Sequence, residues 1–210
     1  MPHRLLIATG NRGKLREFRA LFDALADAGE WNLVSPAEVG LDGFEVVEDG
    51  DTYAANAGRK ARAYANAAGL PALADDSGLE VDALDGAPGL YSARYAGADA
   101  DDATNRAKLL DALHGVAAEQ RSARFRCLIG IAFPYTTNVR LGEGVVEGRI
   151  AVDQRGELGF GYDPLFELPD GRRMAELSTE EKNRISHRAR ALADARWALK
   201  SLAKTLDATG

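Results

Sequence analysis

Several short segments of this chain combine glycine with polar side chains in patterns that suit phosphate chemistry. The first follows an apolar stretch and opens a helical pattern, and it consists of Thr9, Gly10, Asn11, Arg12, Gly13 and Lys14. Free N–H groups at a helix start attract anions, and glycine lets a phosphate approach the backbone. The segment predicts a phosphate-binding loop, although an ordinary strand-to-helix turn explains it equally well when it is taken alone. Its spacing is not that of a Walker A loop.

Two acidic segments could hold a metal ion. Asp75 and Asp76 end an apolar run and precede Ser77 and Gly78, and a separate acidic stretch contains Glu48. Mg²⁺ is usually held by one or two carboxylates together with the phosphates of the substrate. Side chains alternate along a strand, so we expect the two aspartates to point in different directions unless the chain turns there. Taken alone, each segment is more typical of a solvated acidic turn.

Two further segments could contact a base and its sugar. The first is rich in glycine and contains Phe160, Gly161, Tyr162 and Asp163. Aromatic rings set among glycines can offer their faces to a base, but they could also cover the core of a tight loop. The second segment carries the hydrogen-bond donors Lys182, His187 and Arg188. A solvated helix face is the alternative interpretation of this second segment.

The strands that must position these segments follow from runs of apolar residues. Residues 4–9 predict a short buried strand, and residues 72–75 predict another that ends in a turn at residues 77–78. Residues 124–133 and 138–148 predict an antiparallel pair joined by a turn. Because βα units alternate with this hairpin, we expect an α/β protein with a mixed sheet.

Helices are predicted where apolar residues recur every three or four positions. Residues 14–28 predict a helix that stops at Gly29, and residues 102–114 predict a second one. An alanine-rich helix opens at Thr52 and ends near Gly69. The capping box that begins at Ser178 starts a further helical region, with a break expected at Ser186.

Length, net charge, apolar runs and cysteine content restrict the classes of protein to which this sequence can belong. A length of 210 residues suits one domain, residues 1–210, or two tightly joined lobes. The net charge of -6 and the lack of a basic tract argue against a nucleic-acid partner. No apolar run is long enough to cross a membrane. The single cysteine, Cys127, fits a reducing compartment, so we expect a cytoplasmic protein.

The motifs together, in this order, closely resemble the inosine/xanthosine triphosphate pyrophosphatase family. The resemblance extends from about residue 4 to residue 199. The segments that carry it are Thr-Gly-Asn-x-x-Lys from Thr9, Ala-Asp-Asp-Ser-Gly-Leu from Ala74, Gly-Phe-Gly-Tyr-Asp-Pro-Leu-Phe from Gly159, and Glu-Glu-Lys-Asn-x-x-Ser-His-Arg from Glu180.

The resemblance implies Mg²⁺-dependent hydrolysis of ITP, dITP, XTP and dXTP to the monophosphate and pyrophosphate, which cleans the nucleotide pool. It also implies an elongated mixed sheet flanked by helices, two lobes with a nucleotide-binding cleft between them, and a homodimer. Asp76 is the implied metal ligand and proton acceptor, and Glu48 the implied second ligand. The residues implied to contact substrate are Thr9, Gly10, Asn11, Arg12, Gly13, Lys14, Lys60, Ser77, Phe160, Gly161, Tyr162, Asp163, Lys182, His187 and Arg188.

One departure from the family pattern bears on the metal site. Ala55 stands where the family often has glutamate, which weakens any metal-ligand role for this helix. Three alternative functions stay open. They are a related pyrophosphatase for modified pyrimidine or methylated nucleotides, a nucleotide-sensing module without catalysis, and an RNA-binding protein. The acidic balance disfavours RNA binding, and carboxylates beside a phosphate loop disfavour a pure sensor.

Overall fold

The computed structural model describes residues 2–25 and 30–209. The chain forms two compact units, each with its own hydrophobic core. The first unit comprises Met1–Asp76, Cys127–Gly144 and Arg188–Gly210. The second comprises Ser77–Arg126 and Val145–His187. Within the described part of the chain, no helix is both long enough and apolar enough to cross a membrane.

The strands form one mixed sheet, as predicted. Its order is β2-β1-β3-β4-β5-β6, and β1 pairs in parallel with both β2 and β3, whereas β5 and β6 are antiparallel. The connection between β4 and β5, residues 133–138, is too short for the crossover that a parallel pair needs. The strands are β1 His3–Ile7, β2 Trp31–Val34, β3 Ala72–Val81, β4 Ser122–Ala132, β5 Val139–Ile150 and β6 Phe166–Glu167.

Side-chain caps set the ends of most helices. The side chains of Thr52, Asp101 and Ser178 each accept a hydrogen bond from a backbone N–H in the first turn, and Ser178 is part of the predicted capping box. The break at Ser186 is confirmed. The helix predicted over residues 14–28 is too long, because α1 ends at Asp23 and Ala24 is its C-cap, and the predicted stop at Gly29 lies outside the described residues. The helices are α1 Arg12–Asp23, α2 Tyr53–Ala68, α3 Asp102–Ala112, α4 Thr179–Ile185, α5 His187–Asp194 and α6 Arg196–Thr209.

The predicted turn at residues 77–78 is wrong, because β3 runs straight through these residues to Val81. Residues 72–76 are all buried, and Leu79 and Val81 are buried again beyond the predicted turn. Burial on both sides of the segment favours a continuous strand, and it outweighs the local turn preference of Ser77 and Gly78. Asp75 and Asp76 therefore lie inside a regular strand, where consecutive side chains point to opposite faces.

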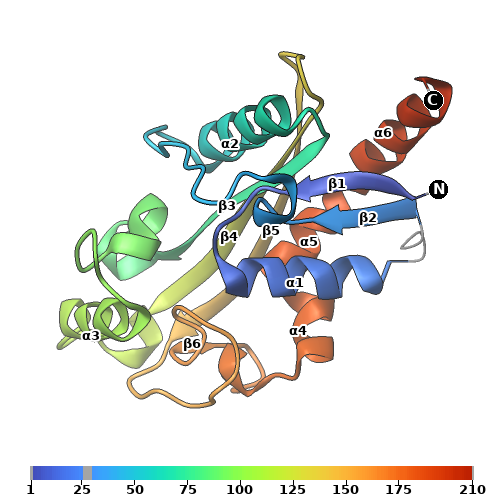
Figure 1. Ribbon diagram of the computed structural model, residues 1–210. Helices are drawn as coiled ribbons and strands as arrows, with labels where there is room; N and C mark the ends of the chain where they lie inside the picture. The colour runs from blue at the N-terminus through green and yellow to red at the C-terminus, as the bar shows by residue number, and fades with distance from the viewer. Residues whose placement is uncertain (1, 26–29, 210) are drawn as a thin grey trace. The chain divides into compact units, whose positions relative to one another are not determined.

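The first unit buries apolar side chains on both faces of its strands. Leu5 and Ile7 pack into one cluster with residues of α1, α5 and α6, whereas Leu6 and Ala8 pack into another with residues of α2. Figure 1 shows α1 and α2 on opposite sides of β1. The same alternation in β3 places Leu73 with the α1 cluster and Ala74 with the α2 cluster. Each face of β3 therefore has its own chemical environment.

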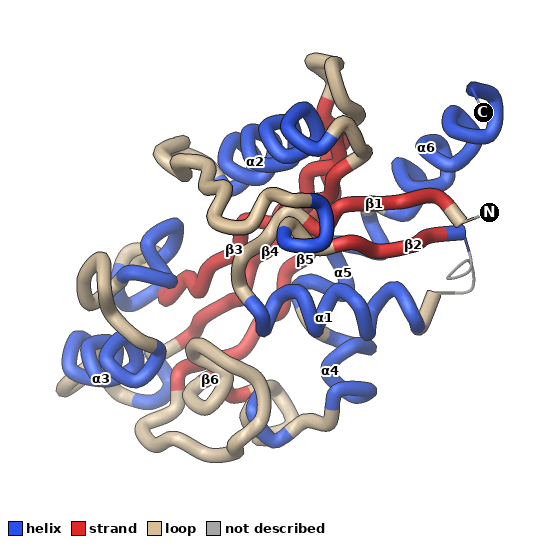
Figure 2. The backbone as a smooth tube through the Cα atoms, in the orientation of Figure 1, coloured by secondary structure: helices blue, strands red, loops and turns tan. Residues whose placement is uncertain are grey.

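The second unit has a core that holds an irregular loop in place. Leu109 of α3 and Leu113, the C-cap of this helix, pack with Phe125 and Phe166, whose rings lie 4.5 Å apart. Residues 151–165 carry no helix or strand and are drawn as loop in Figure 2. The glycine-rich stretch that contains Phe160 and Tyr162 is therefore irregular.

Candidate active site

The predicted phosphate loop connects β1 to α1, and its own side chains hold it in shape. The Asn11 carboxamide oxygen accepts hydrogen bonds from the N–H groups of Gly13 (2.8 Å) and Lys14 (3.0 Å). The Asn11 N–H donates to the hydroxyl of Thr9 at 3.1 Å. Asn11 therefore caps α1, as expected of one of the best helix-capping residues, and the role of this loop in binding phosphate stays a prediction. A Cβ placed on Gly10 would meet no heavy atom within 4 Å, so the backbone there has open space beside it.

Asp75 lies on the α1 face of β3 and is completely buried among cations. Its Oδ2 is 3.0 Å from Lys14 Nζ and accepts a hydrogen bond from Arg188 Nε at 3.1 Å. Arg188 Nη1 also donates to Glu17 at 2.9 Å. Burial raises the pKa of Asp75, but the positive charges of Lys14, Arg188 and Lys60 together outweigh burial and hold the pKa well below its usual value. Asp75 is therefore a fixed anion in a structural ion network.

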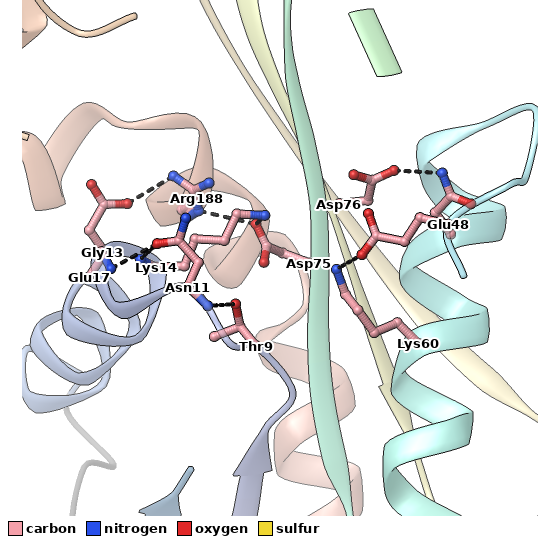
Figure 3. A network of polar contacts seen from close by, with 11 residues as sticks. Thr9, Asn11, Gly13, Lys14, Glu17, Glu48, Lys60, Asp75, Asp76 and Arg188 are labelled. Carbon is pink, nitrogen blue, oxygen red and sulfur yellow. Dashed lines mark hydrogen bonds and ion pairs between the residues drawn. The ribbon is translucent and has the colours of Figure 1, made fainter. Parts of the chain in front are cut away.

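Asp76 lies on the other face of β3, as Figure 3 shows. Its Oδ2 accepts a hydrogen bond from Asn56 Nδ2 at 3.0 Å, and only 6% of the residue is exposed. Burial is the main cause that raises the pKa of Asp76, and the negative charge of Glu48 raises it further. The Asn56 hydrogen bond and the charges of Lys14 and Lys60 oppose this shift without cancelling it. The prediction that the two aspartates diverge is confirmed.

Lys60 of α2 is the cation on the Asp76 side. Its ammonium group donates to Glu48 Oε1 at 2.5 Å, and the residue is 8% exposed. Burial lowers the pKa of Lys60, but the negative charges of Asp75, Glu48 and Asp76 raise it more. Lys60 therefore stays protonated at neutral pH and can neutralise a phosphate or a carboxylate in this region.

Glu48 and Asp76 form a donor pair that fits Mg²⁺. Among residues 2–25 and 30–209, no group of three His, Cys, Asp or Glu side chains could hold a metal ion by itself. Two carboxylates completed by substrate phosphates are, however, the usual magnesium site. The effect of Glu48 on the pKa of Asp76 is the repulsion expected of two nearby carboxylates, and a divalent cation would relieve it. The oxygen donors and their charge thus suit this metal.

A second group of predicted site residues lies in the second unit. Lys182 Nζ donates to Asp163 Oδ2 at 2.6 Å and lies 5.3 Å from the centre of the Phe160 ring. The Phe160 N–H donates to the same carboxylate oxygen at 3.0 Å. Gly159 has a φ of 81°, and a Cβ there would lie 2.1 Å from Asp163 Oδ2. Glycine is therefore required at this position for Asp163 to hold the loop.

A cavity of about 910 Å³ opens beside Phe160 in the second unit. Its volume is within the range of small-molecule pockets, and it offers an aromatic ring together with charged groups of both signs. Arg106 Nη1 donates to the Gly161 carbonyl at 2.8 Å, and Asp102 accepts from the Gly161 N–H at 2.7 Å. The lining includes Asp101, Asp102, Arg106, Gln154, Arg155 and Phe160.

Several site residues were missed or placed differently by sequence reasoning. Tyr162 was predicted to shape the pocket, but its ring is in the core and its hydroxyl donates to the Ser92 carbonyl at 2.9 Å. His187 is buried and stacks on Phe125, with ring centroids 4.8 Å apart. Asn56 and Arg106 were missed. Both lie on predicted helices, but no local pattern shows that they reach segments far away in the chain.

The positions of the other predicted residues do not test their roles in binding substrate, so these roles stay predictions. Ser77 follows Asp76 directly in β3 and is partly exposed. Arg12 is the first residue of α1 and is exposed. Gly161 is held by Arg106 and Asp102. Arg188 was predicted at the edge of the base, whereas the structure places its guanidinium between Asp75 and Glu17 with 3% of the residue exposed.

Comparison with known proteins gives consistent matches along almost the whole chain. The Ham1 family model matches residues 5–197. The dITP/XTP pyrophosphatase of Desulforamulus reducens is 52% identical over 191 residues, which cover 90% of this chain and 92% of the relative. The dITP/XTP pyrophosphatase of Geobacillus kaustophilus is 50% identical over 92% of this chain and 93% of its own length.

A solved structure shares the fold. The HAM1 protein from Coxiella burnetii superposes with a TM-score of 0.79 and 40% sequence identity, and the match covers 99% of both chains. Sequence and fold thus agree with the motifs described above, and the chain belongs to the Ham1 family.

Proposed function

We propose that this protein hydrolyses the triphosphates of non-standard purine nucleosides, namely ITP, dITP, XTP and dXTP, to the monophosphate and pyrophosphate. The observation that carries the proposal is the carboxylate pair Asp76 and Glu48 beside Lys60 on one face of β3. Family relatives that are about half identical in sequence bear the name dITP/XTP pyrophosphatase, which supports this choice of substrate.

In the proposed reaction, a water oxygen bonds to the α-phosphorus while the bond from that phosphorus to the bridging oxygen breaks, and pyrophosphate leaves. Such reactions depend on positioning and on neutralising the charge that spreads over the phosphate oxygens. Lys14 and Lys60 are the buried or partly buried cations that would stabilise that charge. The raised pKa of Asp76 suits a group that accepts the proton of the attacking water.

Glu48 and Asp76 would hold Mg²⁺. When bound, the metal would neutralise phosphate oxygens and make water a better nucleophile. Asp76 cannot bind the metal tightly and also act as a strong base, so its role as metal ligand is the primary one proposed. Asn56 and Lys60 would hold the two carboxylates in place through the contacts described above.

For base selection, hypoxanthine and xanthine carry a keto oxygen at C6, where adenine carries an amino group. Arginine can only donate hydrogen bonds, so Arg188 suits the keto oxygen. The structure engages Arg188 with Asp75 and Glu17, so contact with a base would require it to use its remaining N–H groups. Lys182, His187 and the ring of Phe160 are the other groups proposed for base and sugar contacts.

We also propose that the whole chain is one pyrophosphatase domain acting as a homodimer in the cytoplasm. The domain and the homodimer follow from the family resemblance, and the location follows from the single cysteine, which fits a reducing compartment. The cleft between two lobes that the resemblance implies stays a prediction.

The test is a panel of nucleoside triphosphates incubated with Mg²⁺, in which pyrophosphate and orthophosphate are measured separately. We expect pyrophosphate from dITP and XTP, with kcat/KM above that for ATP by about 10⁴ or more, since a site built from donors rejects a base that leaves them unpaired. Orthophosphate as the first product, without any contaminating pyrophosphatase, contradicts the proposal. Preferential cleavage of modified pyrimidine or methylated nucleotides would favour the related pyrophosphatase, and binding without cleavage would favour a sensor.

A further inference from the structure

One buried side chain, Asn56 of α2, connects the two segments that carry the proposed metal ligands. Its Oδ1 accepts a hydrogen bond from the Gly50 N–H at 2.8 Å, and its Nδ2 donates to Asp76 Oδ2 at 3.0 Å. Gly50 lies two residues after Glu48. Asn56 is 3% exposed, so both hydrogen bonds are shielded from water.

The orientation of this carboxamide is fixed by its partners. The Gly50 N–H can only donate, so the oxygen of Asn56 must face it and the NH₂ group must face Asp76. A carboxylate that accepts such a hydrogen bond cannot rotate without losing it. Asn56 therefore sets the direction in which Asp76 presents its oxygens.

The loop around Glu48 is held against α2 at several points. Lys60 pairs with Glu48 at 2.5 Å, and Arg59 donates to the Val47 carbonyl at 3.3 Å. Asn56, Arg59 and Lys60 are spaced so that they share one face of a helix. Of these three residues, Asn56 also donates a hydrogen bond to Asp76 and so links the loop to β3.

Close packing shows that this link tolerates little change. A Cβ on Gly50 would lie 2.7 Å from Asn56 Oδ1 and 3.0 Å from the Cβ of Ala55. The first distance is too short for a real side chain, so any larger residue at position 50 would push the loop away from Asn56. The loop thus depends on glycine at the point where Asn56 binds it.

We propose that Asn56 is a positioning residue for the magnesium site, which fixes the Asp76 carboxylate and its separation from the Glu48 segment through one carboxamide. The proposal rests on the proposed function, because it takes Asp76 and Glu48 as the ligands. Partners that hold metal-binding carboxylates by hydrogen bonds strongly influence metal affinity.

The test compares Asn56→Leu with Asn105→Leu. Asn105 is an equally buried asparagine, 3% exposed, that bonds only backbone groups in its described contacts: the Ala96 N–H at 2.8 Å and the Ala93 carbonyl at 3.1 Å. Both substitutions remove two buried hydrogen bonds and keep the number and branching of the side-chain heavy atoms, and the larger volume of leucine affects both variants alike. The readouts are Mn²⁺ affinity without nucleotide, measured from the electron paramagnetic resonance signal of free Mn²⁺, the Mg²⁺ dependence of kcat, and Tm.

We expect both variants to lose thermal stability, but only Asn56→Leu to lose metal affinity, by about 10–100-fold. Gly50→Ala displaces the same hydrogen bond from the loop side, so it should also lower the affinity for Mn²⁺. This variant replaces Asn56→Leu in the test if Asn56→Leu does not fold. Unchanged Mn²⁺ affinity in a folded Asn56→Leu or Gly50→Ala variant overturns the positioning role, as does an equal loss in Asn105→Leu. Failure of the proposed function is seen separately, as wild-type protein that binds Mn²⁺ but releases no pyrophosphate from dITP.

Discussion

The two faces of β3 treat adjacent aspartates in opposite ways. On the α1 face, Asp75 is completely buried and contacts both Lys14 and Arg188, and its pKa is held well below the usual value. On the α2 face, Asp76 is nearly as buried, but its nearest described partner is the neutral carboxamide of Asn56 and its pKa is raised. Glu48, which lies on this second face, adds a further negative charge.

The difference indicates which carboxylate is available for chemistry. Asp75 has its charge balanced by protein cations, so a metal ion would gain little from it and would have to compete with Lys14 and Arg188. Burial and the negative charge of Glu48 disfavour the charged form of Asp76, so positive charge supplied by a ligand would stabilise this pair of carboxylates. Perturbed carboxylates of the second kind are typical of functional sites.

The largest effect is expected from Asp76→Asn. Turnover of dITP should fall by about 10²-fold or more, because the variant removes a proposed metal ligand and mutating even a partner of such a ligand typically costs about 10–100-fold. Tm should stay the same or rise, because burial and the negative charge of Glu48 disfavour the charged form of Asp76. Measuring kcat and Tm of the same preparation checks both parts. A variant with near-normal turnover at saturating Mg²⁺ would show that Asp76 is the wrong acid.

Asp75→Asn should lose stability and retain more turnover, which is the opposite of what we expect for Asp76→Asn. Breaking a buried pair leaves Lys14 and Arg188 without their shared anion, and such changes typically cost about 3–5 kcal/mol of stability. The free energy of unfolding in urea measures this loss. Residual turnover of the folded fraction should exceed that of Asp76→Asn. A fully stable Asp75→Asn protein would contradict the role of Asp75 in the structural network.

The pH dependence of the stability difference between wild type and Asp75→Asn provides a control for this prediction. Because the pKa of Asp75 is lowered on folding, its stabilisation is present above the unfolded value of about 3.9 and is lost as pH falls towards the folded pKa. The stability difference between wild type and Asp75→Asn should therefore be full above about pH 5 and shrink below about pH 4. A difference that does not change across this acid range would mean that the Asp75 charge is not its source.

The smallest of these effects is expected from Glu48→Gln. The Mg²⁺ concentration for half-maximal rate should rise by about tenfold or more. Mutation of a residue that only hydrogen-bonds a metal ligand already lowers metal affinity by about that factor. Titration of the dITP rate with Mg²⁺ measures this change, and kcat at saturating Mg²⁺ should change much less than in Asp76→Asn. If the metal titration does not move, Glu48 serves only to pair with Lys60.

The elements that position the site were largely predictable from the sequence. The caps at Thr52 and Ser178 and the stop at Gly69 are local signals, and the helices begin and end where these signals indicate. The exception was Ser77-Gly78, where the turn preference of two residues was outweighed by the buried residues on either side of them. Local preference is a poor guide when neighbouring strands supply partners for every backbone group.

The contacts of the site were less predictable, because they join residues far apart in the chain. The divergence of Asp75 and Asp76 followed from alternation alone. The partner of Arg188, by contrast, was not predictable from its neighbours, since Asp75 lies 113 positions away. Asn11 was interpreted as a ligand for phosphate, whereas its carboxamide caps α1. A side chain that suits both roles cannot be assigned to one of them without coordinates.

The alignment of β3 with β1 has a consequence for how the chain can vary. Ala72 lies opposite Leu6 and Leu73 opposite Ile7. A shift of β3 by one residue would move every side chain to the other face of the sheet. The two aspartates would then exchange environments, and the acid balanced by cations would become the one facing Glu48. The apolar residues at positions 72–74 fix the register of β3 and thereby determine which aspartate faces Glu48, although they are not among the residues proposed to contact substrate. A deletion or insertion there could inactivate the protein while leaving both aspartates in the sequence.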